Sequence, residues 1–292
     1  MTLTPTRTLM TAAAAAGTGI GAFNVIHLET AEALVGAAER AGLPVILQIS
    51  ENCAAYHGAL DPIALATLAI ASASSAPVAV HLDHAVDERL AYGAIDLGFG
   101  SVMYDGAHLD YAENVAITAR VTARAHAAGV YVEAELGKVG GKDGAHAPGV
   151  RTDPAEAVAF VAATGVDALA VAVGSSHAMT ERSASLDTGL IAELRAALAV
   201  PLVLHGSSGA SDAQIQAAIR AGMTKINVST HLNGHFTGAV RHYLGENPTV
   251  VDSRKYIAPG RSAVTAEAAR MLELFALRDV NTDEARSLGA RS

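Results

Sequence analysis

Val200-Pro-Leu-Val-Leu-His-Gly-Ser-Ser-Gly209 is the stretch of this sequence that decides its fold class. It predicts a short buried strand that ends at a histidine and is followed by a Gly/Ser turn, and residues 211–219 continue it with helical spacing of apolar residues. A histidine at a strand end can bind a metal ion, and backbone N–H groups in a Gly/Ser turn before a helix can bind phosphate. The stretch therefore indicates a strand–turn–helix unit suited to metal-assisted chemistry on a phosphorylated substrate.

The same alternation of strand and helix runs through the whole chain. Strands are predicted at 21–25, 45–50, 78–82, 101–104, 130–135, 168–173, 202–204 and 225–228. Ala-rich segments with apolar residues at i, i+3 and i+4 separate them, for example 31–41, 64–73 and 115–127. Strands that alternate with helices form parallel sheets, and eight such units in 292 residues are what a (β/α)8 TIM barrel requires. A doubly wound open sheet is the alternative, but the G-x-G-x-x-G turn typical of many such folds is absent after the first strand.

The segments outside the eight units predict one α/β domain over 1–292 with two additions. The barrel is expected over about 18–245, after an extra N-terminal helix that contains the Ala12–Ala16 run. A C-terminal helical extension is expected over about 246–292, with its helix at 262–277.

Composition excludes several classes of protein. The chain is 51% hydrophobic and 17% charged, which predicts a large core rather than disorder. A net charge of −9 without a basic cluster argues against nucleic-acid and membrane partners, and no apolar run is long enough to cross a bilayer. The single Cys53 excludes an internal disulfide and fits a cytoplasmic location.

Polar residues concentrate where the predicted strands end, whereas the opposite loops are bland. Since catalytic residues of barrels lie at the carboxyl ends of the strands, this asymmetry places the functional site there. The polar residues at these ends are Asn24, His27, Ser50, Glu51, Asn52, Asp83, His84, Asp105, His108, Glu133, Glu135, Ser175, Ser176, His177, His205, Ser207, Ser208, Asn227, Ser229 and Thr230.

Three of these residues, His84, His177 and His205, predict a metal site at the barrel mouth. Three imidazoles leave a tetrahedral zinc ion one open position for substrate or water. Three independent hydrogen-bonding histidines are the alternative. Asp83 precedes His84, and because neighbouring strand residues diverge, it is expected to face the substrate as a general acid/base. The alternative role of Asp83 is to orient a metal-binding histidine.

A phosphate site is predicted from the segments 206–208 and 227–230 together with Ser50, since barrels commonly bind phosphate at strands seven and eight. Ser229 and Thr230 precede a helix, so simple N-caps are the alternative for them. A Schiff-base mechanism is not expected. Lys225 stands at the predicted start of the eighth strand, away from the mouth, and the other three lysines are in loops. The metal is then expected to act as the electron sink.

These residues together resemble the class II, zinc-dependent fructose- and tagatose-bisphosphate aldolases over about residues 9–277. The matching segments, in chain order, are 22–25, 44–50, 81–84, 101–106, 132–137, 171–177, 205–209 and 225–230. The resemblance implies zinc ligation by His84, His177 and His205, an alternative or second metal position at Asp105 and Glu135, and Asp83 as the proton-transfer group. It also implies a site for dihydroxyacetone phosphate made of Asn24, Ser50, Ala178, Gly206, Ser207, Ser208, Asn227, Val228, Ser229 and Thr230.

The resemblance further implies a monovalent cation, Na⁺ or K⁺, near this phosphate, and a homodimer or homotetramer. In the family's Asp-Pro-Arg, the arginine can reach the far phosphate, sometimes from a neighbouring subunit, and Arg254 stands in the similar Asp252-Ser-Arg254. The implied reaction is reversible cleavage of a ketose 1,6-bisphosphate, foremost fructose 1,6-bisphosphate, to dihydroxyacetone phosphate and glyceraldehyde 3-phosphate. Tagatose 1,6-bisphosphate, another phosphorylated ketose, and a non-catalytic metal- and phosphosugar-binding barrel remain alternatives.

The chain departs from the family pattern at three places. The Gly-rich segment 137–153, a predicted lid, reads Gly-Gly-Lys-Asp-Gly at 140–144, where the family has a glutamate that is the candidate base. Asp143 and His146 are the candidate replacements. Ala178 stands where glycine commonly follows the histidine, and residues 51–56 differ from those of a standard glycolytic enzyme. These departures concern the acceptor aldehyde rather than the metal and phosphate sites.

Overall fold

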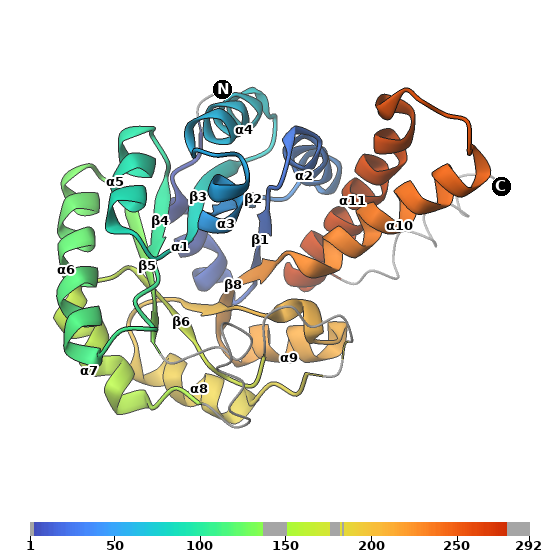
Figure 1. Cartoon of the computed structure of the whole chain (residues 1–292). Coiled ribbons are helices and arrows are strands. Elements are labelled where there is room, and N and C mark those ends of the chain that lie inside the picture. The colour runs from blue at the N-terminus through green and yellow to red at the C-terminus, as the bar shows by residue number, and fades with distance from the viewer. Residues whose placement is uncertain (1–2, 137–150, 176–181, 183, 279–292) are drawn as a thin grey trace.

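The computed structural model describes residues 3–136, 151–175, 182 and 184–278, and it contains a closed barrel of parallel strands (Figure 1). Each strand pairs with the next in the chain, and β8 closes the ring by pairing with β1, for example Gly21 with Ile226. The strands are β1 (Ile20–Asn24), β2 (Val45–Ser50), β3 (Val78–Ala85), β4 (Ser101–Tyr104), β5 (Tyr131–Leu136), β6 (Ala168–Val171), β7 (Leu202–Leu204) and β8 (Met223–Val228). The predicted (β/α)8 barrel is therefore confirmed.

Most of the helices form a ring outside the barrel, and α1 lies across one end of it (Figure 1). The helices are α1 (Thr6–Ala16), α2 (Leu28–Ala41), α3 (Glu51–Tyr56), α4 (Asp61–Ala73), α5 (Glu88–Asp96), α6 (Tyr111–Ala127), α7 (Pro154–Thr164), α8 (Thr188–Ala197), α9 (Asp212–Ala221), α10 (Thr230–Glu246) and α11 (Ser253–Phe275), with the short 3-10 helix η1 at Ser207–Gly209. Local sequence starts several of them, because Asp87, Asp153 and Ser211 accept a backbone N–H bond as N-caps. No helix in the described part of the chain combines the length and apolar character that a membrane crossing requires.

The core has two layers, one on each face of the strands. The outer layer fills the space between strands and helices and includes Leu34, Phe160 and Ile191. The inner layer fills the barrel with small and medium side chains such as Ala22, Ala79 and Ala170. Complete burial of a side chain such as Leu34 or Ile191 contributes about 1.5–3 kcal/mol, so both layers stabilise the ring.

The expected N-terminal helix closes the bottom of the barrel. Leu9 and Met10 of α1 belong to the inner layer, and Thr6 Oγ1 donates to Ser101 Oγ, at the start of β4, over 2.9 Å. Arg7 pairs with Asp167, just before β6, at 2.8 Å. With this end closed, access to the interior is from the carboxyl ends of the strands.

The C-terminal extension is also present, but its helix begins earlier than predicted. α11 starts at Ser253 rather than at 262, because Asp252 caps it and the helix continues through Pro259. It packs against α2 and α10, and Phe275 near its end contacts Phe23 of β1. The α10–α11 pair extends to one side of the barrel (Figure 1).

Candidate active site

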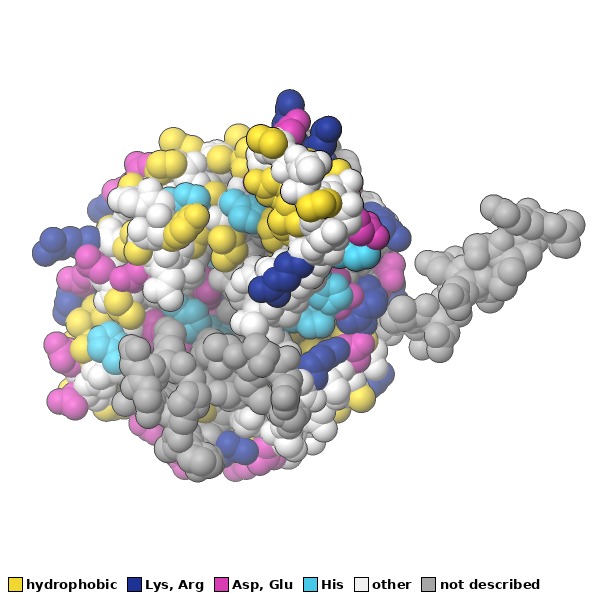
Figure 2. Space-filling model, turned by 45° about the vertical axis from the view of Figure 1, so that its right-hand side comes forward, with side chains coloured by type: hydrophobic (Ala, Val, Ile, Leu, Met, Phe, Trp, Pro, Cys, Tyr) yellow, Lys and Arg dark blue, Asp and Glu magenta, His cyan; other side chains and the backbone are white. Residues whose placement is uncertain are grey.

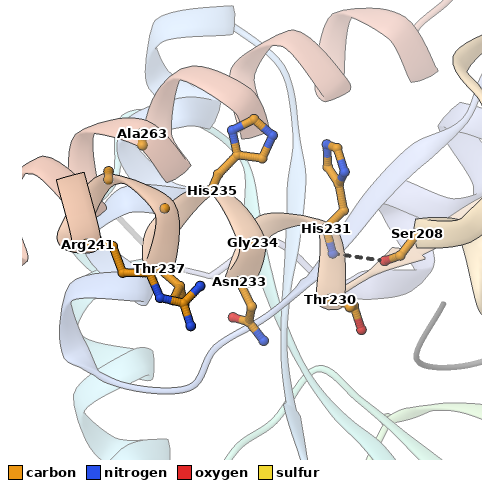
Figure 3. A pocket seen from close by; sticks show the side chains of 11 residues that line it. Ser208, Thr230, His231, Asn233, Gly234, His235, Thr237, Arg241 and Ala263 are labelled. Atoms are coloured by element: carbon orange, nitrogen blue, oxygen red, sulfur yellow. Dashed lines mark hydrogen bonds between the residues drawn. The ribbon is translucent and has the colours of Figure 1, made fainter. Parts of the chain in front are cut away.

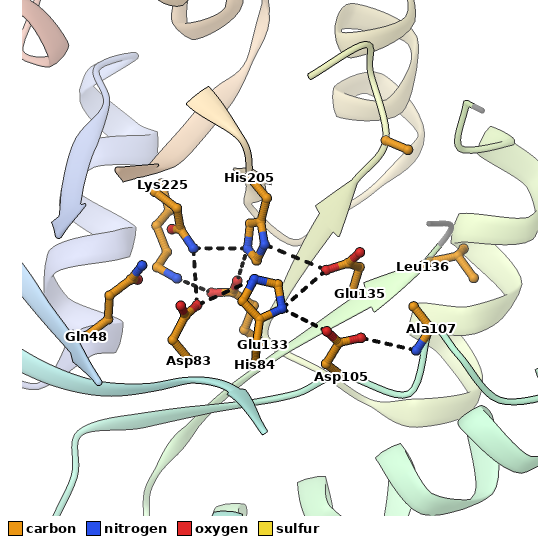
Figure 4. A network of polar contacts seen from close by, with 12 residues as sticks. Gln48, Asp83, His84, Asp105, Ala107, Glu133, Glu135, Leu136, His205 and Lys225 are labelled. Carbon is orange, nitrogen blue, oxygen red and sulfur yellow. Dashed lines mark hydrogen bonds and ion pairs between the residues drawn. The ribbon is translucent and has the colours of Figure 1, made fainter. Parts of the chain in front are cut away.

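The polar cluster inside the barrel mouth is centred on two histidines of different strands. His84 comes from β3 and His205 follows β7, and their ring centroids lie 4.5 Å apart at 78° (Figure 4). The His205 side chain is fully buried, and that of His84 is 12% exposed. Two of the three predicted metal ligands therefore meet. The third, His177, and its neighbour Ala178 lie outside the described residues.

An unusual backbone conformation points both Asp83 and His84 into this cluster. Neighbouring strand residues were expected to diverge, but His84 has a φ of 50°, and the β3–β4 register shifts between Leu82 and Ala85. His84 Nε2 lies 3.9 Å from Asp83 Oδ1. The expected divergence was therefore wrong, because a left-handed residue breaks the alternation. Such a conformation costs roughly 1–3 kcal/mol in a non-glycine residue and commonly marks a functional site.

Two carboxylates of neighbouring strands complete a donor set around the histidines. His84 Nδ1 lies 2.8 Å from Asp105 Oδ2 and 3.7 Å from Glu135 Oε2, and His205 Nδ1 lies 3.6 Å from the same Glu135 oxygen. Ligands 2.0–2.1 Å from a tetrahedral zinc ion stand about 3.3 Å apart, so these spacings fit a bound divalent cation with little rearrangement. The residues Asp105 and Glu135, predicted for an alternative metal position, form with His84 a group whose ligand atoms lie within 4.8 Å of one another, and His205 adjoins this group through Glu135.

Asp83 is held by two amides that approach its two oxygens. Asn24 Nδ2 donates to Oδ2 over 3.1 Å, and Asn227 Nδ2 donates to Oδ1 over 3.3 Å. Gln48 donates to Asn24 Oδ1 over 2.8 Å, which fixes the amide of Asn24 in the orientation that serves Asp83. Burial acts to raise the pKa of Asp83, but His84, Lys225, His205 and the Asn24 hydrogen bond outweigh it, and the pKa lies below its ordinary value. Asp83 is therefore a carboxylate at neutral pH.

A chain of buried polar groups supports the cluster from below. Glu133 Oε1 lies 2.9 Å from His205 Nε2, and Glu133 Oε2 accepts a hydrogen bond from Lys225 over 2.7 Å (Figure 4). Lys225 Nζ also lies 3.3 Å from His81 Nε2, and His81 Nδ1 contacts Ser101 Oγ at 2.8 Å. Burial, followed by the charge of Lys225, holds the pKa of His81 well below its ordinary value. His81 is therefore a neutral partner of Lys225.

The position of Lys225 differs from its prediction, and its neighbour His81 was not among the residues that the sequence analysis singled out. β8 begins at Met223 rather than at Lys225, and the lysine side chain lies in the barrel interior beside the polar cluster instead of away from it. Sequence spacing could have predicted these buried polar residues, because side chains two residues apart on a strand lie on the same face. The pairs are His81 with Asp83, Glu133 with Glu135, and Lys225 with Asn227.

The predicted phosphate-binding turns lie side by side at the ends of β7 and β8. Ser207 Oγ donates to the carbonyl oxygen of Asn227, and Ser208 Oγ accepts from the backbone N–H of His231 over 3.2 Å. Gly206 has a φ of 66°, a conformation that glycine adopts without strain, and it turns the chain directly into η1. The side chain of Ser229 makes no capping hydrogen bond, so the simple N-cap alternative does not describe it.

The remaining predicted residues are placed as follows. Ser50 pairs with Asp83 across β2 and β3, and its Oγ accepts a hydrogen bond from the backbone N–H of Cys53 over 3.2 Å. Arg254 is the second residue of α11 and pairs with Asp252 at 2.9 Å. α11 begins at the end of the α10–α11 pair that extends away from the barrel (Figure 1). The candidate lid residues Asp143 and His146 lie outside the described residues.

Comparison with known proteins places these features in a family. The sequence model of "Fructose-bisphosphate aldolase class-II" matches residues 4–279. The fructose-bisphosphate aldolase of Geobacillus stearothermophilus is 42% identical over 260 residues, covering 88% of this chain and 91% of that protein. That of Thermus caldophilus is 38% identical over 90% of this chain and 94% of its own. The crystal structure of the YdjI aldolase from Escherichia coli K12 superposes with a TM-score of 0.79 at 31% identity, covering 94% of this chain and 97% of that one.

Proposed function

Since the chain belongs to the class II fructose-bisphosphate aldolase family, whose members are metal-dependent lyases that act on phosphosugars, we propose that it cleaves fructose 1,6-bisphosphate with a bound zinc ion. The products are dihydroxyacetone phosphate and glyceraldehyde 3-phosphate. The observation that carries the proposal is the position of Asp83. Its two oxygens are held by Asn24 and Asn227, beside the donor set of His84, His205 and Glu135.

The donor set supports zinc as the metal. Two imidazoles with one or two carboxylates are ligands that zinc prefers over magnesium or calcium, which bind oxygen almost exclusively. His84, His205, Glu135 and Asp105 would hold the ion, with His177 proposed as a further ligand. A zinc ion bound there supplies a Lewis acid for the carbonyl group of the ketose.

Asp83 is the group that moves the proton of the cleavage step. In that step the C4 hydroxyl proton passes to Asp83, the C3–C4 bond breaks, and C4 becomes the aldehyde carbon of glyceraldehyde 3-phosphate. The electron pair of the broken bond stays on the three-carbon ketone fragment, and protonation of its carbon completes dihydroxyacetone phosphate. The lowered pKa of Asp83 keeps it in the basic form that cleavage needs. Asn24 and Asn227 fix the direction from which it reaches the hydroxyl.

Buried polar atoms near Asp83 suit a substrate rich in hydroxyl groups. Gln48 Oε1 and Asn227 Oδ1 are buried and accept no hydrogen bond from the described residues. An unsatisfied buried acceptor costs about 1–3 kcal/mol, and a sugar hydroxyl can supply the missing donor. These two amides therefore support the binding of an open-chain ketose at the mouth of the barrel.

The phosphate on the ketone fragment is proposed to bind at the two linked turns. The segments 206–208 and 227–230 lead into η1 and α10, and the first backbone N–H groups of a helix lack partners within the helix and can bind an anion. This local binding is needed because the chain carries a net charge of −9, which repels a bisphosphate at long range. We also propose that a sodium or potassium ion binds beside this phosphate. Ser50 and Ala178 are proposed to contribute to the same site.

Assembly and location form a further part of the proposal. Arg254 stands at the start of α11, and this end of the α10–α11 pair extends away from the barrel (Figure 1). We propose that Arg254 acts in a neighbouring subunit of a homodimer or homotetramer. Sedimentation measures the oligomeric state of the wild type and of Arg254→Ala. Cleavage kinetics of the same two proteins measure the effect of the substitution on activity. A cytoplasmic enzyme is proposed because the only cysteine, Cys53, is a buried free thiol.

A coupled assay tests the proposed reaction. Purified protein is given fructose 1,6-bisphosphate or tagatose 1,6-bisphosphate, before and after chelation and again after zinc is restored. The proposal expects faster cleavage of the fructose substrate, loss of activity on chelation, and its return with zinc. Faster cleavage of the tagatose substrate would assign the alternative substrate, and activity that survives complete metal removal would overturn the metal-dependent mechanism.

A further inference from the structure

A second cluster of metal-binding side chains lies on α10, beyond the phosphate-binding turn. His231 and His235 are four residues apart, so they project from the same side of the helix. Their ring centroids are 4.8 Å apart, and Figure 3 shows the two rings side by side while Asn233 and Thr230 point away from them. Histidines also appear on the face of the molecule drawn in Figure 2, some of them beside arginine or lysine.

A carboxylate from α11 completes the cluster. Glu267 Oε1 lies 2.7 Å from His231 Nε2, with side-chain exposures of 11% and 18%. The helices come this close because Gly260 of α11 faces Phe236 of α10, where an added Cβ would lie 2.8 Å from the phenyl ring. His231, His235 and Glu267 each offer one ligand atom, and these three atoms all lie within 4.8 Å of one another.

Surrounding charges prepare these groups for a cation. Arg270 donates to both oxygens of Glu267, at 2.9 and 2.7 Å, and also to Asp212 at 2.6 Å. Burial acts to raise the pKa of Glu267, but the hydrogen bonds from His231 and Arg270 lower it to about 2, so it is ionised. Burial lowers the pKa of His235, although the charge of Glu267 partly opposes this.

We propose that His231, His235 and Glu267 bind a divalent cation of the zinc type, at a site separate from the one inside the barrel. Two imidazoles and a carboxylate form a zinc-preferring set. Tetrahedral zinc ligands stand about 3.3 Å apart. Ligand atoms that already lie within 4.8 Å of one another can reach this spacing by side-chain rotation. Both histidines line a cavity of about 810 Å³, which leaves the fourth ligand position to water. The positive charge of Arg270 makes this site weaker than the site in the barrel.

His235 distinguishes a metal site from a simple link between two helices. The His231–Glu267 hydrogen bond already joins α10 to α11, and that role needs no second imidazole. Among the described residues, none makes a hydrogen bond to the ring of His235, although it stands next to the pair. A role limited to helix linking predicts that His235 is dispensable for zinc binding, whereas the proposed site requires it.

Zinc stoichiometry tests the proposal. The protein is dialysed to equilibrium against buffered zinc, and bound zinc is counted by mass spectrometry in the wild type, His235→Gln and a matched control, His242→Gln. His242 is on the same helix, is 75% exposed and faces Glu246. The expected counts are two equivalents for the wild type, one for His235→Gln and two for His242→Gln. Unfolding followed with and without zinc should show that His235→Gln loses the part of the stabilisation by zinc that comes from the site on α10. A count that His235→Gln leaves unchanged, or that His242→Gln lowers equally, overturns the proposal.

A second variant separates this site from the one in the barrel. His205→Ala, which removes a proposed ligand of the catalytic metal, should keep one equivalent of zinc, and His205→Ala with His235→Gln should keep none. If His205→Ala retains both equivalents while His235→Gln loses one, the ligand assignment in the barrel fails and the site on α10 stands. If His205→Ala retains none, the site on α10 is overturned. The single variant His235→Gln decides the question by itself, should His205→Ala fail to fold.

Discussion

Lys225 Nζ donates a hydrogen bond to Glu133 Oε2 over 2.7 Å inside the barrel, where the two side chains are 2% and 1% exposed. The other oxygen of Glu133 lies 2.9 Å from His205 Nε2, on the opposite side of the ring from Nδ1 and Glu135. A carboxylate behind a metal-binding imidazole fixes the orientation of the ring and strengthens its metal bond. The lysine therefore stabilises, through Glu133, the position of a proposed metal ligand.

Glu133→Gln is expected to weaken metal binding by about tenfold or more, because the charge behind His205 is lost. It should also lower the free energy of unfolding by about 3–5 kcal/mol, since Lys225 is left buried without its counter-charge. Adding Lys225→Met should recover much of the stability but not the metal affinity. Calorimetric metal titration and denaturant unfolding measure the two quantities. A double variant that binds metal like the wild type would show that Glu133 acts only as a counter-charge.

Asp83→Asn is expected to lower kcat for cleavage by about 10²–10⁴, because the proton acceptor for the C4 hydroxyl is removed while the shape of the side chain is kept. Metal content should stay at the wild-type level. Metal content is the discriminating measurement, since Asp83, His84 and His205 could together hold an ion. Loss of metal along with activity would make Asp83 a metal ligand rather than the proton-transfer group.

Gly206→Ala is expected to raise KM for the bisphosphate and to cost roughly 1–2 kcal/mol, because alanine is strained at the φ of 66° that this turn requires. Gly129→Ala is the matched control. Its φ of 74° gives similar strain, but it lies before β5 at the opposite end of the barrel, with no atom within 4 Å of an added Cβ. The control should lose stability without a change in KM. Equal KM values for both variants would remove the turn at Gly206 from the phosphate site.

Asp212→Asn is expected to reduce stability at pH 7, and to reduce it progressively less as the pH falls below the unfolded pKa of an aspartate. Burial acts to raise the pKa of Asp212, yet its hydrogen bonds to Arg270 and Arg182 lower it. A carboxyl whose folded pKa is depressed stabilises the fold above its unfolded pKa of about 3.9, and this contribution disappears as the pH falls through the folded pKa. Thermal unfolding across this range measures it, with the exposed Glu193→Gln as control. A difference from the wild type that is constant with pH would contradict the prediction. High salt should shrink the effect, because the Asp212 side chain is 38% exposed.

The sequence predicted the strands closely, because a buried parallel strand is a short β-branched run between helical segments. β2, β4 and β7 begin and end at the predicted residues. β3 was predicted to end at Leu82 but continues to Ala85, since pairing with β4 resumes after the register shift. The start of β8 was missed because Met223 and Thr224 lie next to Gly222, and the misplaced Lys225 followed from that error.

The sequence by itself determined which strand ends carry Asp83, His84, Glu135, His205 and Asn227, because the order of the chain fixes which residues follow each strand. Only the tertiary structure decided how they combine. Closure of the ring brought β3, β5 and β8 around one interior. The left-handed conformation of His84 turned two neighbouring side chains inward. Glu133 and Lys225, which are 92 residues apart in the sequence, formed a buried ion pair. The physical reason is that local spacing sets the face of a strand on which a side chain lies, whereas contacts between strands depend on the register and curvature of the whole barrel.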